Sequence, residues 1–350
     1  MKPADSKLFP LQRDSGSPGP AKGRRWAVVV VSWNNETLLN ECLESVRAQT
    51  IGAERIQTIL VDNASEDGSV QFVQARFPEV EIIEVGWNSG FSHANNVGIR
   101  HAFEDPSVAG VVMLNSDARL RPNWLETIVS FAETRPRGAS FQSLTLDHAN
   151  PSVIDSHHLY VGRSLHATQF DTGKPLDRDY ATQRVFGVNA AAALYTRAFL
   201  EAQPFDNYLD ETMGMYLEDV DLAARALVMG WESWFVAGTH ATHIGSASSK
   251  MRSSGFALRQ TWRNQPVMLL TNFPMRLLIR GIRGFLAHEI GAIRHLRATG
   301  QPELVAEIVR GRRDGLRLIP YALARRKRLR AHRILDPELL WSFMNEGTAL

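Results

Sequence analysis

Short apolar runs alternate with amphipathic stretches over the first 135 residues of the chain. The run Trp-Ala-Val-Val-Val-Val at 26–31 predicts a buried strand, and the apolar spacing over 36–49 predicts a helix with one buried face. The alternation then repeats, with strands predicted at 56–61, 80–85 and 108–114 and with helices between them and at 124–134. Strands that alternate with helices across short turns are typical of α/β proteins, in which a mostly parallel sheet carries helices on both faces.

The pattern becomes looser in the second half of the chain. Few helical signals occur over 139–195. A helix is predicted from the acidic stretch at 215–221 onward, followed by a short strand at 234–236. From 255 the chain is predicted to be helical, and Pro274 should break or kink that segment.

The polar residues that follow the predicted strands should gather at one edge of the sheet. Right-handed crossovers bring the ends of parallel strands together, and open α/β sheets bind ligands at that edge. Ser32, Trp33, Asp62, Asn88 and Asp117 all occupy such positions. Each turn alone would say little, but their convergence predicts a binding site.

Two of these turns suit a nucleotide. The Asp62 carboxylate can accept the ring N–H of a pyrimidine, although an Asx-turn or a helix N-cap explains the residue equally well. In the loop at 86–91 and the helix start at 95–98, glycines let a nucleotide approach the backbone, and asparagines can reach its ribose or base. A tight turn followed by helix packing is the alternative.

Acidic residues and one histidine suit a metal ion and a general base. Asp117 offers the oxygen ligand that Mg²⁺ or Mn²⁺ prefers, and the ion would hold a diphosphate; a helix cap is the alternative. Glu218, Asp219 and Asp221 crowd like charges at a helix start. Such crowding fits a general base whose pKa a neighbouring acid adjusts, or merely a favourable helix dipole. His243 is either a metal or phosphate contact or a structural histidine.

Composition restricts the class of protein. The chain has 350 residues, 44% of them hydrophobic and 22% charged, which is ordinary for a globular protein with a substantial core. The single cysteine, Cys42, excludes an intrachain disulfide and a cysteine-based metal site, and it fits a reducing compartment. No apolar run approaches the roughly 18 residues of a membrane-spanning helix, and the N-terminus lacks a signal-peptide core. We therefore expect a cytoplasmic protein.

The net charge of +2 hides a concentration of arginine in the C-terminal third. Arginines among the apolar positions after 266 predict an amphipathic face for an anionic membrane surface, which would make the protein peripheral on the cytoplasmic face of the inner membrane. A helical subdomain with a solvated charged face is the alternative. Nucleic acid is not expected as a partner, because aromatic residues do not interleave with the basic cluster at 325–333.

Seven segments, in their order and at their separations, resemble the family 2 inverting glycosyltransferases of the GT-A fold, and within them the rhamnosyltransferase-like bacterial enzymes. The resemblance covers about two-thirds of the chain, from about Trp26 to Asn264. The segments are VVVVSWNN, VDNASEDGS, NSGFSHANNVG, LNSD, GVNAAAALY, YLEDVDLAARA and HIGS.

The resemblance implies a metal-dependent, inverting transfer of a sugar from dTDP-rhamnose or a UDP-sugar to a hydroxyl of a cell-surface glycan or a lipid-linked acceptor. Asp219 would be the catalytic base, with Glu218 beside it. Asp117 and His243 would hold Mg²⁺ or Mn²⁺ with the diphosphate. The implied nucleotide-binding residues are Ser32, Trp33, Asn34, Asp62, Asn88, Gly90, Asn96 and Asn115.

Three positions depart from the family pattern. Asn115 stands in place of the first Asp of an Asp-X-Asp motif, Trp33 where Tyr is frequent, and Asn95 where many members carry Arg. Because a neutral Asn115 is a weaker metal ligand, a catalytically impaired sugar-nucleotide- or glycan-binding module is the alternative function. A dinucleotide-dependent dehydrogenase is rejected, because the turn after the first strand lacks the Gly-X-Gly-X-X-Gly pattern.

Three parts are expected along the chain, with the acceptor determined chiefly by residues 151–183. They are a disordered arm (1–24), a GT-A domain (25–254, divided into a nucleotide-binding half at 25–135 and an acceptor and catalytic half at 136–254), and a basic amphipathic helical region (255–350).

Overall fold

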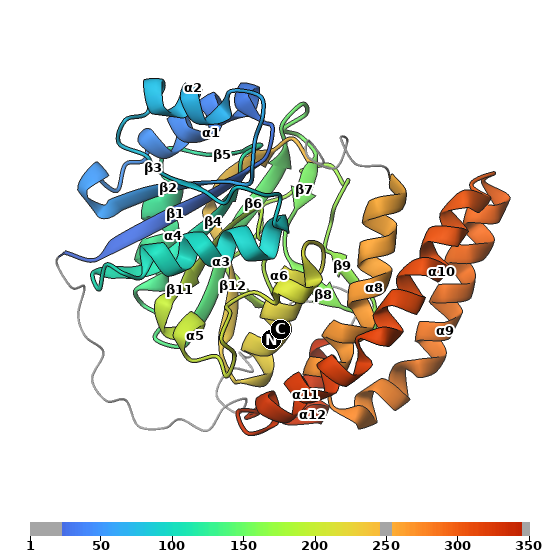
Figure 1. Cartoon of the computed structure of the whole chain (residues 1–350). Coiled ribbons are helices and arrows are strands. Elements are labelled where there is room, and N and C mark those ends of the chain that lie inside the picture. Colours follow the sequence, from blue (N-terminus) through green and yellow to red (C-terminus); the bar gives the residue numbers. More distant parts are fainter. Residues whose placement is uncertain (1–22, 246–253, 345–350) are drawn as a thin grey trace.

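The computed structural model describes residues 23–245 and 254–344, which form a central β-sheet between helices and a helical region beside it (Figure 1). In the first half of the sheet the strands are parallel, in the order β4-β1-β2-β3. These strands are β1 (Arg25–Ser32), β2 (Ile56–Asp62), β3 (Glu81–Glu84) and β4 (Val108–Asn115). The helices between and after them are α1 (Glu36–Arg47), η1 (Ala53–Arg55), α2 (Ser69–Arg76), α3 (Gly90–Ala102) and α4 (Trp124–Ala132).

The second half of the sheet is mixed. Strand β11 (Ala192–Thr196) runs antiparallel between β4 and β6 (Gly138–Asp147), and β6 pairs in parallel with β12 (Glu232–His243). Shorter strands complete this half: β5 (Ala118–Leu120), β7 (Ile154–Ser156), β10 (Gln183–Val185) and the hairpin β8 (Leu159–Val161) with β9 (Ala167–Gln169). The remaining helices of this part are α5 (Arg197–Glu201), η2 (Glu211–Met213) and α6 (Glu218–Val228).

Strand β12 is longer than the short strand predicted at 234–236. It continues to His243, and its pairing with β6 shifts register between Phe235 and His240. The irregularity coincides with Gly238, whose φ of 92° interrupts the alternation that identifies a strand in the sequence. The extension matters because it carries His243 to the edge of the sheet.

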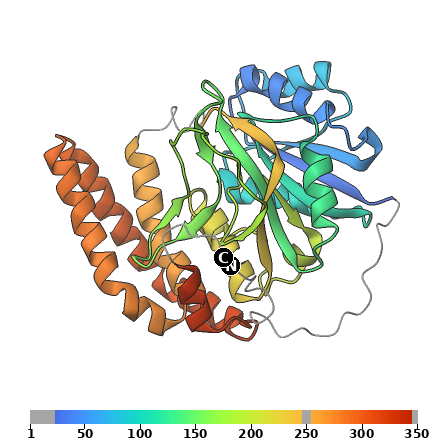
Figure 2. The same cartoon turned by 180° about the vertical axis from the view of Figure 1, so that it is seen from behind.

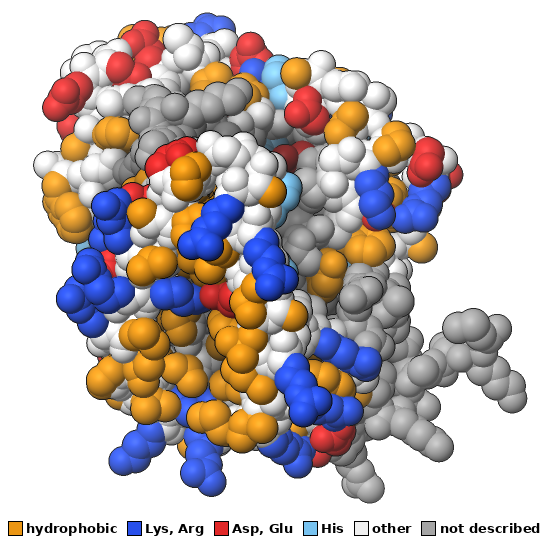
Figure 3. All heavy atoms as spheres, turned by 90° about the vertical axis from the view of Figure 1, so that its right-hand side faces the viewer, with side chains coloured by type: hydrophobic (Ala, Val, Ile, Leu, Met, Phe, Trp, Pro, Cys, Tyr) orange, Lys and Arg blue, Asp and Glu red, His pale blue; other side chains and the backbone are white. Residues whose placement is uncertain are grey.

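The C-terminal helices pack beside the sheet, over α6 (Figures 1 and 2). Pro274 separates the first two of them, as predicted. The helices are α8 (Ser254–Asn272), α9 (Met275–Ala298), α10 (Pro302–Arg317), α11 (Ile319–Arg330) and α12 (Pro337–Phe343). Their outer face carries hydrophobic side chains interspersed with Lys and Arg (Figure 3). Among the helices built from described residues, none is both long and apolar enough to cross a membrane.

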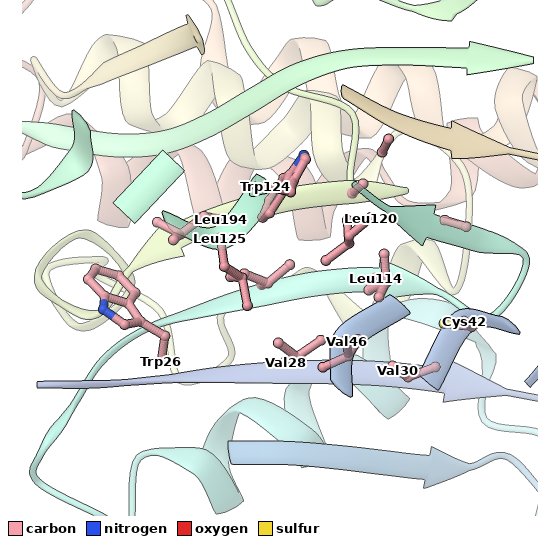
Figure 4. Close-up of a cluster of buried hydrophobic side chains, with 14 of the residues drawn as sticks. Trp26, Val28, Val30, Cys42, Val46, Leu114, Leu120, Trp124, Leu125 and Leu194 are labelled. Carbon is pink, nitrogen blue, oxygen red and sulfur yellow. The ribbon is translucent and has the colours of Figure 1, made fainter. Parts of the chain in front are cut away.

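The core lies on both faces of the sheet because successive strand residues point in opposite directions. Val28 and Val30 pack with α1 and α4 (Figure 4), whereas Ala27 and Val29 pack with α3, α5 and α6. A further core joins α6 to the C-terminal helices. The predicted α/β class, with flanking helices and a helical C-terminal region, is confirmed.

The predicted disordered arm lies outside the described residues, apart from its last two positions. The proposed boundary between the GT-A domain and the helical region also follows a stretch, 246–253, that is not described. The domain limits therefore stay predictions.

Candidate functional site

A cavity of about 480 Å³ opens where the carboxyl ends of β1 and β4 meet the start of α6. Its volume is that of a small-molecule site. Eight of the residues singled out in the sequence line it: Trp33, Asn88, Gly90, Asn115, Asp117, Glu218, Asp219 and His243. The predicted convergence of strand ends thus occurs, and α6 brings the two acids from the second half of the chain to the same place.

One wall of the cavity is built around His243. Strand β5 pairs with the end of β12 so that His243 lies opposite Ala118, directly beside Asp117. The His243 Nε2 atom is 3.1 Å from Asp117 Oδ1 and 3.3 Å from Asn115 Nδ2. The other ring nitrogen, Nδ1, is 3.0 Å from Asp155 Oδ2. The imidazole therefore sits between two carboxylates.

These neighbours determine the charge of the imidazole. Burial alone favours the neutral ring and lowers its pKa, but hydrogen bonds to Asp117 and Asp155, together with their negative charges, raise the pKa of His243 to about 10. A proton on His243 therefore offsets one of the two negative charges of this wall.

The same atoms fit a divalent ion. Adjacent ligands of an octahedral Mg²⁺ or Mn²⁺ lie about 3 Å apart, which is the separation of Asp117 Oδ1 and His243 Nε2. Asn115 can turn its amide so that oxygen faces the same point, since its O and N atoms are interchangeable in shape. Asp155 would hold His243 from behind, as carboxylates do for metal-bound histidines. The donor set of two oxygens and one imidazole nitrogen is one that Mn²⁺ and Mg²⁺ accept.

A second wall of the cavity carries Glu218 and Asp219, in the first turn of α6. Asp219 Oδ1 accepts a hydrogen bond of 2.8 Å from the Val220 N–H. Burial raises the pKa of Asp219 to about 6, although the backbone N–H groups of Val220 and Ala190 lower it. Burial, and then the charge of Asp219, raise the pKa of Glu218 well above its ordinary value. Both acids therefore keep their protons to a higher pH than ordinary carboxyl groups do.

The backbone before these acids is strained. Tyr216 and Leu217 both adopt left-handed φ angles, of 69° and 68°, although neither is glycine. Both residues line the cavity, and Leu217 is the residue from which α6 starts. Non-glycine residues in this region persist only where neighbouring contacts hold them, and such positions concentrate at functional sites.

The glycine-rich loop lies between the two walls. Gly90 has a φ of 81°, and a Cβ atom there would come within 3.0 Å of the Gly214 carbonyl oxygen. Asn63 supports this loop, because its Oδ1 accepts hydrogen bonds of 2.8 Å from both the N–H and the hydroxyl of Ser89. Gly90 therefore allows the loop at 88–92 to approach the turn that precedes α6.

Asp62 and Ser32 lie below the cavity rather than on its surface. They are register partners at the ends of β2 and β1, and both are buried. Asp62 Oδ2 accepts the N–H of Ser65, three residues on, at 2.9 Å, so this oxygen stabilises the turn after β2. Asp62 Oδ1 and Ser32 Oγ are buried without a hydrogen-bond partner among the described residues. These two atoms offer unused hydrogen-bonding capacity at the sheet edge.

Asn34 and Asn96 have structural contacts instead of a place on the cavity surface. Asn34 Oδ1 accepts the Glu66 N–H at 2.8 Å and so joins the turns after β1 and β2. Asn96 is fully buried: its Nδ2 donates to Leu209 O and Glu211 Oε1, and its Oδ1 accepts from Leu209 N–H, each at 2.9 Å. Asn96 thus supports the segment at 209–211, and its assignment to the nucleotide pocket stays a prediction.

Several cavity residues were not expected from the sequence. Asp155 comes from the three-residue strand β7, and Thr168 and Gln169 come from the hairpin. Asn189 follows β10, and Thr261 lies on α8. For the residues within 151–183 the only available signal was the general expectation that this range determines the acceptor. Asn189 belongs to the segment GVNAAAALY, but nothing in the sequence marked its side chain for the cavity.

Comparison with known proteins places this site in a family. The model named "Glycosyl transferase family 2" matches residues 27–202, which is 176 of the 350 residues. Among curated proteins, the chain is 28% identical to the N-acetylglucosaminyl-diphospho-decaprenol L-rhamnosyltransferase of Mycobacterium tuberculosis over 236 residues, which cover 62% of this chain and 75% of that protein.

Two solved structures show the same fold. The S. aureus TarS 1–349 complex with UDP-GlcNAc superposes with a TM-score of 0.56 at 15% identity, covering 91% of this chain and 90% of the other. The mannosyltransferase PcManGT of Pyrobaculum calidifontis, in complex with GDP-Man and Mn²⁺, has a TM-score of 0.51 at 18% identity and covers 94% and 90% of the two chains.

Proposed function

The chain belongs to glycosyl transferase family 2 and transfers a sugar from a nucleotide sugar, and we propose that it does so with inversion, using Asp219 as its base. The donor would be dTDP-rhamnose or a UDP-sugar, and the acceptor a hydroxyl of a cell-surface glycan or a lipid-linked sugar. The observation that carries the proposal is that the Asp117–His243–Asp155 group and a carboxylate of raised pKa, Asp219, line one cavity.

Asp219 has the properties that the reaction needs. A base works best when its pKa lies near the working pH, and burial moves Asp219 toward that value. In the proposed step Asp219 takes the proton of the acceptor hydroxyl, the hydroxyl oxygen bonds to the anomeric carbon, and the bond from that carbon to the diphosphate breaks. Attack from the side opposite the leaving group gives inversion.

Asp117, His243 and Asn115 would receive the leaving group at the other wall. A bound Mg²⁺ or Mn²⁺ would supply charge neutralisation for the nucleoside diphosphate there. Asp155 keeps the His243 ring oriented through its 3.0 Å contact with Nδ1. The Mn²⁺ in the GDP-Man complex of the mannosyltransferase supports a divalent ion as cofactor.

The nucleotide would extend toward the ends of β1 and β2. Trp33, Asn88 and Gly90 line that side of the cavity. Asp62 Oδ1 and Ser32 Oγ are buried and lack a hydrogen-bond partner among the described residues, which supports a role for them in recognising the base. The turn after β2 would have to move for the base to reach these two atoms. UDP-GlcNAc in the TarS structure supports a pyrimidine nucleotide.

A lipid-linked acceptor is supported by the name of the mycobacterial relative, whose acceptor is a decaprenol diphosphate. The hairpin of β8 and β9 contributes Thr168 and Gln169 to the cavity and would contact the acceptor sugar. An enzyme with such an acceptor must work at a membrane surface. We propose that α9 provides the contact.

Helix α9 has the composition of a helix that lies on anionic lipid. The segment 275–330, which spans α9 and the two helices after it, contains 14 Lys and Arg against 4 Asp and Glu. Its net charge is therefore +10, in a chain whose total net charge is +2. Nine of the eleven large hydrophobic side chains exposed in the described residues lie in the C-terminal helical region. Five of them, spaced by three or four residues, form one stripe on α9: Met275, Ile279, Ile282, Leu286 and Ile290. Apolar insertion and attraction of arginine to lipid phosphates would both favour binding.

Vesicle sedimentation tests this location. The protein should bind vesicles rich in phosphatidylglycerol, and Ile279→Asn with Leu286→Asn should abolish binding while leaving transfer to a water-soluble acceptor unchanged. Equal binding by the double variant contradicts the membrane contact. A wild-type dimer in solution that the double variant disrupts would instead identify the stripe as an interface between two copies.

A panel of nucleotide sugars with Mg²⁺ or Mn²⁺ tests the activity itself. The correct donor should raise the melting temperature, because binding to the folded state stabilises it by the logarithm of occupancy. Metal-dependent hydrolysis of that donor without acceptor separates an enzyme from a binding module that has lost catalysis. Binding without any hydrolysis or transfer would favour the module.

A further inference from the structure

We infer that Asn264, on the C-terminal helix α8, is a positioning residue for the base Asp219. The inference rests on the proposed function, because it concerns the residue that would take the acceptor proton. The inference extends the proposed function, because it gives the C-terminal helical region a part in positioning the base. The link between them is the strained turn at 213–217.

The amide of Asn264 is a clamp on that turn. Its Nδ2 lies within hydrogen-bond distance of three carbonyl oxygens of the turn, those of Met213 (2.9 Å), Met215 (3.0 Å) and Tyr216 (2.8 Å). Asn264 is fully buried, so water does not replace these contacts. The two N–H groups of one side chain are thus shared among three carbonyl oxygens of the segment between η2 and α6.

Arg263 fixes the direction of the amide. Its Nη1 donates to Asn264 Oδ1 at 2.6 Å and to Thr212 O at 2.8 Å. With the amide oxygen occupied by a guanidinium, only the NH₂ group can face the turn. The two neighbouring residues of α8 therefore act together on the residues at 212–216.

The clamped turn needs support because of its backbone conformation. Tyr216 and Leu217 are consecutive left-handed residues, and neither has the freedom of glycine. Leu217 O accepts the Asp221 N–H at 2.8 Å, so the direction of α6 is established directly from the turn. Relaxation of Tyr216 or Leu217 toward ordinary φ angles would rotate the start of α6 and displace Asp219.

The glycine-rich loop at 88–92 also contacts the turn. The Ser92 N–H donates to Gly214 O at 2.8 Å, next to the close approach of Gly90. The turn is therefore fixed between α3, on the donor side, and α8. Since a displacement of about 1 Å from the reactive geometry can reduce a rate by about 10²-fold, loss of the α8 contact should act on the chemical step.

Asn264→Asp tests the inference with little change in shape. It replaces the NH₂ group by an oxygen that faces three carbonyl oxygens. We expect kcat to fall by roughly 10- to 100-fold, with KM for the donor and the affinity for nucleoside diphosphate within about threefold of wild type. The low-pH limb of kcat/KM should also move from about 6 toward the ordinary carboxyl value, as Asp219 becomes more exposed.

Hydrogen exchange gives a readout that does not depend on activity. The amides of residues 214–221 should exchange faster in Asn264→Asp, while those of β1 and β4 keep their protection. Arg263→Gln leaves the Asn264 amide in place but removes its anchor, and it should show the same changes at smaller size. This second variant keeps the test valid should Asn264→Asp fail to fold.

Thr271→Ala is the matched control. Thr271 lies on the same helix, is equally buried, and its hydroxyl has no hydrogen-bond partner within 23–245 or 254–344. This variant should lose stability but keep kcat and the exchange of 214–221. The inference is overturned when Asn264→Asp retains wild-type kcat, or when Thr271→Ala loses as much. A wild-type protein with no transferase activity, but with exchange at 214–221 still dependent on Asn264, would refute the proposed function and leave the clamp standing.

Discussion

The two walls of the cavity treat negative charge in opposite ways. On the β4–β12 side, the carboxylates of Asp117 and Asp155 each contact the same His243 ring, which supplies the compensating charge. On the α6 side, Glu218 and Asp219 stand together, and burial raises the pKa of both. The difference teaches that one wall offsets its carboxylate charge with a neighbouring imidazole, whereas the other keeps two acids together in a buried place where the charged form is disfavoured.

The walls also differ in how they are held. Strand pairing places Asp117 and His243, and regular sheet hydrogen bonds fix their separation. The start of α6 depends on a turn with two left-handed residues and on contacts from α8. We therefore expect changes at the first wall to affect binding of donor and metal, and changes at the second to affect the rate of the chemical step.

Among substitutions at the wall that contains His243, the largest effect is expected at Asp117. Asp117→Ala removes a proposed ligand of the metal and one of the two carboxylates that contact His243. Transfer should fall by about 10³-fold, equivalent to about 4 kcal/mol, and metal-dependent binding of nucleoside diphosphate should be lost with it. Titration calorimetry with and without Mn²⁺ measures the binding. Normal binding in the presence of Mn²⁺ would show that this wall does not hold the metal.

Asp155 should give a smaller effect of the same kind. Asp155→Asn keeps a hydrogen-bond acceptor for His243 Nδ1 but removes the charge. Loss of such a supporting carboxylate typically costs about 10- to 100-fold in metal affinity. The apparent Kd for Mn²⁺, measured through donor hydrolysis, checks this, and kcat at saturating Mn²⁺ should stay within about threefold of wild type. A reduced kcat at saturation would place Asp155 in the chemical step.

The pH dependence of kcat/KM for the acceptor, at saturating donor and metal, distinguishes the roles of the two walls. Asp219 must be deprotonated to act, and burial raises its pKa to about 6. The rate should therefore be constant above about pH 7 and fall tenfold per unit below pH 6. Measurement of donor affinity at each pH separates this limb from titration at the metal wall. A limb near pH 4 would mean that Asp219 is not buried as described.

The smallest expected effect is on the free energy of unfolding. Asp219→Asn should increase it at high pH, although the same variant should lower the rate of transfer. Because the folded-state pKa of Asp219 is raised, its stabilising contribution is complete below about pH 4 and is lost as the pH rises through about 6. Asp219→Asn cannot titrate and should be more stable than wild type at pH 8, by roughly 1–2 kcal/mol after allowance for partial exposure. The difference should vanish at pH 4. Urea unfolding at both pH values tests this, and equal stability at pH 8 contradicts a strained charge at Asp219.

The strands of the first half of the chain were predicted more completely from the sequence than those of the second half. Strands such as β1 and β4 are buried on both faces, so they appear as unbroken apolar runs with polar residues where they end. That pattern located Asp117 and the parallel order. Strand β12 contains Gly238 and polar residues between its apolar ones, so only its centre was recognised.

Side-chain roles that depend on tertiary contacts were not visible. A buried asparagine in a helix has the same letter as an exposed one, so the sequence did not show that Asn96 forms hydrogen bonds with Leu209. Asp155 lies in a three-residue strand without a period of its own. Asn264 acts on carbonyls about fifty positions earlier, a relation that only the packing of α8 against the turn reveals.

Asp219→Asn tests the central claim most directly, with Glu218→Gln as its control. The amide of Asp219→Asn keeps the shape of the carboxylate but cannot take a proton. Glu218→Gln makes the same replacement at the neighbouring acid, whose pKa burial and the charge of Asp219 raise well above its ordinary value. In single-turnover transfer with a saturating donor, Asp219→Asn should be slower by about 10²- to 10⁴-fold, and Glu218→Gln by less than about tenfold. Both should bind nucleoside diphosphate with Mn²⁺ as the wild type does. Transfer by Asp219→Asn at a near-wild-type rate would contradict the assignment of the base and the division of labour between the two walls.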